Sequence, residues 1–280
     1  MRKLALILQL AGLLLIPFAG RAQELPFADG EELQYTVYYK SFLVKADLAS
    51  LTMTGTMEPK GYHVAAHVAT FRFWDTFYKI RDLYESWFTP TPELMPVSYH
   101  RDAQESKYWA KNWYDWSQDG LTIRETVEKR NRGRRDTVVH STDIVRDIIG
   151  AIYYLRAGDY AAMERGIPEQ TLMTVDRDIL MVSALVTGRE TIKSEGVSYN
   201  TVKVAVSVKP LDVDAGEASS EISIQSGDDQ YSQIFFWITD DENRIPIRFS
   251  VELGRVGGTA QGRLVRMDGI KYPLTSKIQK

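Results

Sequence analysis

Apolar and polar residues alternate along much of the chain, in short runs divided by turn residues. Residues 62–70 and 244–253 each place their apolar side chains on one face of an extended segment. Groups such as Pro59-Lys60-Gly61 and Asn131-Arg132-Gly133 interrupt the runs at short intervals. Alternation with a period of two, bounded by turn residues, is typical of half-buried strands. The pattern predicts a mainly β protein with antiparallel strands in meander order.

One segment has the spacing of a helix instead. Its apolar positions recur three and four residues apart, which predicts an amphipathic helix over residues 143–157. These positions are Ile144, Val145, Ile148, Ile149, Ile152 and Tyr153. The helix separates two β regions, at residues 31–140 and 158–270, and no Pro- or Ser-rich linker divides them. We therefore expect one domain over residues 23–280: a strongly curved antiparallel sheet, or incomplete barrel, with the helix packed across its concave side.

The N-terminus has the features of a secretory signal. Arg2 and Lys3 precede an apolar run over residues 4–18, and small residues stand at Gly20 and Ala22. The run is shorter than the roughly 20 residues that a membrane span needs. This pattern predicts a signal peptide at residues 1–22, cleavage before Gln23, and a periplasmic or secreted protein without a transmembrane segment in the mature chain.

Composition narrows the function classes. The chain has no cysteine, which excludes disulfides, thiol catalysis, thiolate metal sites and lipid attachment through a cysteine. Removal of residues 1–22 takes away three basic residues and no acid, so the formal charge falls from −3 to −6. An acidic chain is a poor general binder of nucleic acid or of anionic lipid surfaces, and we expect no nucleic-acid partner.

The motifs that carry catalysis or metal binding are absent. No nucleophile elbow, zinc-protease or phosphate-loop pattern occurs, so we expect no catalytic residue and no cofactor. His63 and His67 lie in a predicted strand, where four residues span roughly 13 Å, too far for one metal ion. The acidic residues 240–242 fit a solvated hairpin turn better than a calcium loop. The basic residues around 129–135 fit a charged hairpin tip, with contact to phosphate groups as the alternative.

A band of aromatic residues is the best candidate for a ligand site. In a strand, Trp109 and Trp113 face one way and Trp116 faces the other, so both faces carry large rings. Either a second layer of the protein covers one face, or that face lines a groove for an apolar or sugar ligand. The candidate binding residues are Trp74, Trp87, Trp109, Trp113, Trp116 and the helical Tyr154.

Four motifs in the same order resemble a known family. They are residues 27–33 (FADGEEL), residues 143–156, Gly188-Arg189-Glu190, and residues 236–247 (FWITDDENRIPI). Together they resemble the exported bacterial family of unknown function catalogued as DUF3108. The resemblance implies an envelope protein with no assigned activity. The last motif is also explained as a hairpin without any ligand, with Pro246 at an edge or at the first residues of the returning strand.

Three functions stay open at this point. The first is a non-enzymatic envelope protein that binds a hydrophobic, lipid-like or glycan ligand. The second is a scaffold or assembly factor that binds another envelope protein, and the third is a hydrolase without a recognisable motif. A carrier requires a ligand surface, a scaffold requires a free protein-binding edge, and an enzyme requires a histidine gathered with carboxylates.

Overall fold

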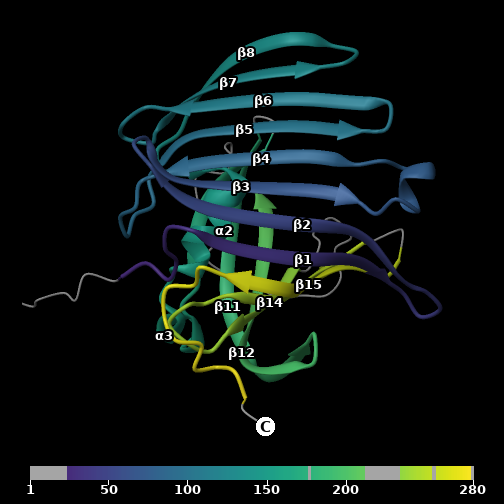
Figure 1. The fold of residues 1–280 in the computed structure, drawn as a ribbon. Coiled ribbons are helices and arrows are strands. Elements are labelled where there is room, and N and C mark those ends of the chain that lie inside the picture. The colour runs from purple at the N-terminus through teal and green to yellow at the C-terminus, as the bar shows by residue number, and fades with distance from the viewer. Residues whose placement is uncertain (1–23, 176–177, 212–233, 254–256, 279–280) are drawn as a thin grey trace, which may run out of the picture.

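The computed structural model describes residues 24–175, 178–211, 234–253 and 257–278. The predicted signal peptide at residues 1–22 lies outside them. Most of the described chain lies in β-strands, as the alternation predicts, and two short α-helices interrupt the strands (Figure 1). In these residues no helix has both the length and the apolar character to cross a membrane.

The strands occur in two runs on either side of the helices. The first run is β1 (Glu31–Lys40), β2 (Lys45–Glu58), β3 (Gly61–Thr70), β4 (Arg81–Phe88), β5 (Pro96–Glu105), β6 (Tyr108–Trp116), β7 (Thr122–Lys129) and β8 (Gly133–His140). A 3₁₀ turn, η1 (Trp74–Thr76), lies between β3 and β4. The second run is β9 (Val145–Arg146), β10 (Glu169–Val175), β11 (Asp178–Ser194), β12 (Val197–Pro210), β13 (Ile234–Thr239), β14 (Pro246–Glu252) and β15 (Thr259–Asp268).

All of these strands form one 15-stranded sheet in the order β8-β7-β6-β5-β4-β3-β2-β1-β15-β14-β13-β12-β11-β10-β9. Each run is a meander, and the pairing of β1 with β15 joins the two runs. Every neighbouring pair is antiparallel except β9 and β10. The sheet curves strongly without closing, because β8 and β9 remain at its two ends (Figure 1). Register shifts in β1 and β11 add local bends, as bulges do. The predicted fold class is confirmed.

The helix differs from its predicted bounds. The helix α2 covers Ile148–Arg156, and the preceding residues Val145–Arg146 form the short strand β9 instead of a first helical turn. Its buried face carries Ile149 and Tyr153, whereas Ile148 is exposed. A second helix, α3 (Tyr160–Glu164), follows directly and was not predicted.

The helix α2 packs across the concave side of the sheet and contacts β4 in one run and β10 in the other. Aromatic rings fill the space beneath it: Phe27, Tyr62, Phe88 and Tyr153 lie within one buried cluster. Gly55 on β2 permits this packing, because a Cβ at that position would collide with the Tyr62 ring. We refer below to the opposite side of the sheet as the outer face.

A buried ion pair connects α2 to both runs. The guanidinium of Arg156 donates to both carboxylate oxygens of Glu31, at 2.6 and 2.7 Å, and both side chains are 2% exposed or less. Burial alone would lower the pKa of Arg156, but the neighbouring Glu31 carboxylate raises it above its usual value. The same guanidinium donates to the carbonyls of Asn243 and Arg244 in the β13–β14 turn. Removal of either partner would leave an unpaired charge in the core, which is strongly destabilising. The ion pair therefore fixes the position of the helix against the sheet.

Candidate ligand-binding site

Strand β6 separates its aromatic residues onto two faces. Tyr114 and Trp116 point to the concave side and are buried, and the Trp116 indole N–H donates to the Val145 carbonyl at 2.7 Å. Trp109 and Trp113 occupy the alternate positions and are half-buried. Direct cross-strand pairing places Trp113 beside His100 and Trp109 beside Gln104 on the outer face. One face of β6 is therefore core, and the other presents its rings outward.

The structure brings three of the six candidate residues to the outer face: Trp87, Trp109 and Trp113. The other three lie elsewhere. Trp74 is in η1, where its indole N–H donates to the Asp47 carbonyl. Trp116 belongs to the core, and Tyr154 on α2 stacks under the guanidinium of Arg146, 3.9 Å from the ring centroid. The six residues do not form one site.

A row of stacked and paired side chains crosses β3 to β6 on the outer face. The His63 ring stacks on Trp87 at 4.2 Å, and the His100 ring stacks on Trp113 at 5.5 Å. Glu85 lies between the two histidines, with one carboxylate oxygen 3.3 Å from His63 Nε2 and the other 3.0 Å from His100 Nδ1. We call these five residues the outer ladder. No sequence pattern points to Glu85, because only strand register brings it between the histidines.

Polar side chains of the outer ladder also pair with Glu58. His63 Nδ1 is 2.8 Å from Glu58, and the same carboxylate accepts the Trp87 indole N–H at 2.9 Å. The hydrogen bond from Trp87 holds the pKa of Glu58 below its usual value. Among the residues that the structure describes, no group of three or more histidines and carboxylates has the geometry to hold a metal ion. The arrangement pairs each imidazole with a carboxylate, and it fixes the two tryptophan rings in place.

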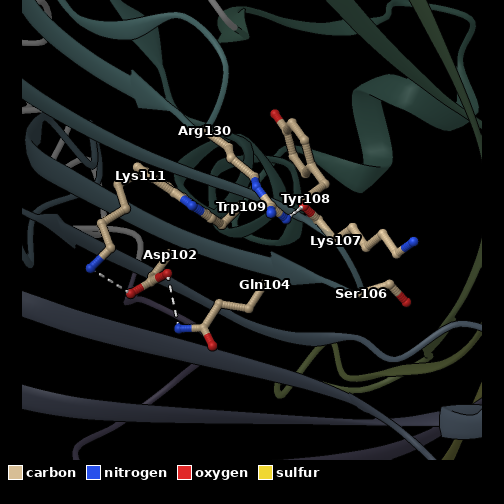
Figure 2. Close-up of a pocket in the computed structure, with 8 residues that line it drawn as sticks. All are labelled: Asp102, Gln104, Ser106, Lys107, Tyr108, Trp109, Lys111 and Arg130. Atoms are coloured by element: carbon tan, nitrogen blue, oxygen red, sulfur yellow. Dashed lines mark hydrogen bonds and ion pairs between the residues drawn. The ribbon is translucent and has the colours of Figure 1, made fainter.

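A hollow of about 270 Å³ adjoins the ladder at the β5–β6 turn. Figure 2 shows its lining: Asp102, Gln104, Ser106, Lys107, Tyr108, Trp109, Lys111 and Arg130. Lys111 Nζ lies 3.1 Å from Asp102, and the Gln104 amide donates to the same carboxylate at 3.3 Å. The Arg130 guanidinium donates to the Lys107 carbonyl across the hollow. Within the described residues, the Trp109 side chain makes no hydrogen bond or ring contact.

The charge of the hollow is positive. Lys107, Lys111 and Arg130 carry three cations against the single carboxylate of Asp102. Arg130 belongs to the basic segment around residues 129–135, which the sequence analysis placed at a hairpin tip. In the fold this tip contacts the β5–β6 turn. Arginine and lysine are the usual partners of carboxylate and phosphate groups. An aromatic ring flanked by hydrogen-bonding groups and cations can hold a flat, polar, negatively charged ligand.

The family model described as "Protein of unknown function (DUF3108)" matches residues 34–264. The chain belongs to the DUF3108 family. No curated protein matches this DUF3108 chain. A similar solved structure is the β-barrel-like protein of the DUF1849 domain from Brucella abortus, with a TM-score of 0.54 and 11% identity. The match covers 88% of this chain and 99% of that one, and at this identity it shows the fold alone.

Proposed function

We propose that this DUF3108 chain is a non-enzymatic binding protein of the bacterial envelope, or of the space outside it, that holds an acidic glycan on its outer face. The observation that carries the proposal is the hollow. There a half-buried Trp109 ring without a partner lies beside Asp102, Gln104 and three cations. The apolar C–H face of a sugar ring packs on an indole, while hydroxyl and carboxylate groups bond to the polar side chains around it.

The outer ladder extends this surface along the sheet. His100 and Trp113 occupy the cross-strand pair next to Asp102 and Lys111, on the same face. A sugar chain seated on Trp109 therefore continues toward a second indole ring that is already fixed by stacking on His100. Rings held in place before binding lose little conformational freedom when a ligand arrives.

Two alternatives, a carrier of a hydrophobic guest and a scaffold that pairs through its sheet edge, have less support. A hydrophobic guest inside the curved sheet would compete with Phe27, Tyr62, Phe88 and Tyr153, which pack in the space under α2. A scaffold that pairs through its sheet edge would use β8, and that strand carries Arg134, Arg135 and Asp136, all exposed. Charged edge strands discourage pairing with another chain.

Affinity electrophoresis through gels that contain a soluble polysaccharide tests the proposal. We expect alginate, an acidic polysaccharide, to retard the wild-type chain, and neutral dextran to retard it less. Trp109→Ala should abolish the retardation, because the ring that supports the sugar is gone. The matched control is Trp237→Ala: Trp237 is also half-buried, but it lies on β13 and donates to Glu190. Retardation that survives Trp109→Ala, or that Trp237→Ala removes equally, would contradict the proposal, as would no retardation of the wild type by any acidic polysaccharide.

A further inference from the structure

Two neighbouring turns at one end of the sheet expose large apolar side chains. In the β1–β2 turn, Phe42 is 99% exposed and Leu43 is 85% exposed. In the segment between β3 and β4, Phe73 is 68% exposed and Phe77 is 71% exposed. We call these residues, together with Val44 and Phe71, the apolar tip. Exposed apolar groups of this size mark contact surfaces for proteins or membranes.

The two turns form one surface. The Trp74 indole N–H donates to the Asp47 carbonyl at 2.6 Å, and the Phe71 amide donates to the Leu48 carbonyl at 2.9 Å. These bonds tie η1 to the first residues of β2. Figure 1 shows both turns at the same end of the sheet, on the right of the view.

The η1 segment is braced, so its exposed rings do not result from a loose loop. Asp75 accepts from Thr70 at 2.6 Å and pairs with Arg81 at 2.6 Å. Phe73, Trp74 and Phe77 also contact each other ring to ring. The fold therefore holds the apolar side chains outward instead of turning them into the core.

Basic side chains surround the apolar tip. Lys40 and Lys45 flank the first turn, and Arg72 and Lys79 flank the aromatic residues of the second. All four are exposed, and none forms an ion pair with another described residue. The nearby acids are already paired: Asp47 with Arg263, at 2.9 Å, and Asp75 with Arg81. The free charge around the tip is thus positive, whereas the whole chain is acidic.

We propose that the apolar tip docks on the surface of an anionic phospholipid bilayer. Phe42 and Leu43 enter the boundary of the acyl chains, together with Phe73 and Phe77. The four basic side chains meet the phosphate headgroups, which attract clusters of lysine and arginine. Trp74 and Tyr78 lie at the level of the headgroups, where amphipathic rings are favoured. Apolar insertion combined with a basic rim is the usual basis of reversible attachment to a membrane surface.

Vesicle flotation tests this proposal with the purified chain. We expect the wild type to float with vesicles of phosphatidylglycerol and phosphatidylcholine, and to float less with pure phosphatidylcholine. Phe42→Ser combined with Leu43→Ser should weaken binding at least about tenfold, because two apolar side chains no longer enter the bilayer. Lys40→Gln combined with Lys45→Gln should weaken it by roughly fivefold per lysine and should reduce its salt dependence.

The matched control is Val138→Ser combined with Ile167→Ser, because both residues are exposed apolar side chains outside the tip. This control should float as the wild type does, and so should Trp109→Ala, which separates bilayer docking from glycan binding. A wild type that does not float with anionic vesicles would overturn the proposal, as would a tip variant that floats unchanged. Light scattering that shows a dimer dissolved by the tip substitutions would assign the surface to a second copy of the chain, and would also overturn it.

Discussion

The buried carboxyl of Asp147 controls the junction between β9 and α2. One oxygen accepts from the amides of Ile149 and Gly150, both at 2.9 Å, so it caps the helix. The other accepts the Ser86 hydroxyl of β4 at 2.8 Å. Burial raises the pKa of Asp147 from 3.8 to about 6, although its hydrogen bonds oppose the increase. The group is thus protonated in the folded chain at pH values where it is already ionised in the unfolded chain.

This difference predicts a pH dependence of stability. Between about pH 4 and pH 6 the folded state holds a proton that the unfolded state has lost, so the free energy of unfolding falls as the pH rises through that window. Relative to Asp147→Asn, the wild type should lose stability over this range and level off above it. Urea unfolding of both proteins at several pH values measures the difference, and parallel profiles would contradict it. Asp147→Ala should cost about 1–3 kcal/mol at pH 4, because two amides and a hydroxyl lose their acceptor, and this cost should shrink as the pH rises through the window.

Single residues also explain the motifs that mark the family. Glu31, Arg156 and Asn243 come from three separate motifs and meet at the buried ion pair. Arg189, from the remaining motif, pairs with Asp240 at 2.9 Å. The sequence placed these motifs in order, but only the long-range contacts show that they join the helix, β1 and the β13–β14 turn. The contacts that these residues make hold the helix and the strands together.

At the scale of elements, β6 offers the clearest comparison of its two faces. Trp116→Ala should cost about 3–5 kcal/mol of stability, because it opens a cavity in a packed core. Trp109→Ala and Trp113→Ala should each cost only about 1 kcal/mol, because their rings are half exposed on the outer face. Urea unfolding of the three variants measures these losses. Equal losses at all three positions would mean that both faces are core, and would remove the outer face as a binding surface.

The helix shows where sequence periodicity fails. Residues Ile144 to Tyr153 have helical spacing, yet Val145 and Arg146 form β9, which pairs in parallel with β10. A short apolar run fits a buried strand as well as a helix, and periodicity alone does not separate the two. Asp147 supplied the missing signal: it is the capping residue, so the helix begins after it. The prediction for Pro246 was more successful, because β14 begins at that residue.

At the scale of the whole molecule, the sequence predicted the curved sheet with a helix across it, because alternation and turn residues report local structure directly. It did not predict the seam between β1 and β15, which pairs residues more than 200 positions apart. The hollow was missed for the same reason. No sequence pattern distinguishes Asp102, Gln104 and Lys111 from other polar residues. Strand register places them beside Trp109, and the β7–β8 turn adds Arg130.

The two proposed surfaces lie at related places on the molecule. The hollow borders the β5–β6 turn, and that turn bonds to the aromatic segment of the apolar tip, since the Ser106 amide donates to the Lys79 carbonyl at 2.7 Å. Both therefore occupy the same end of the sheet (Figure 1). A chain docked by its apolar tip would hold its glycan close to the bilayer surface. Affinity electrophoresis tests the glycan surface, and vesicle flotation tests the apolar tip independently.

Native mass spectrometry of the chain, extracted gently from the cells that make it, tests the central claim most directly. The account predicts that the wild type retains an adduct whose mass corresponds to sugar units with acidic groups. Trp237→Ala should retain the same adduct, and Trp109→Ala should lose it while remaining folded. An acyl-chain lipid in place of the sugar would contradict the account, and so would a glycan adduct that persists in Trp109→Ala.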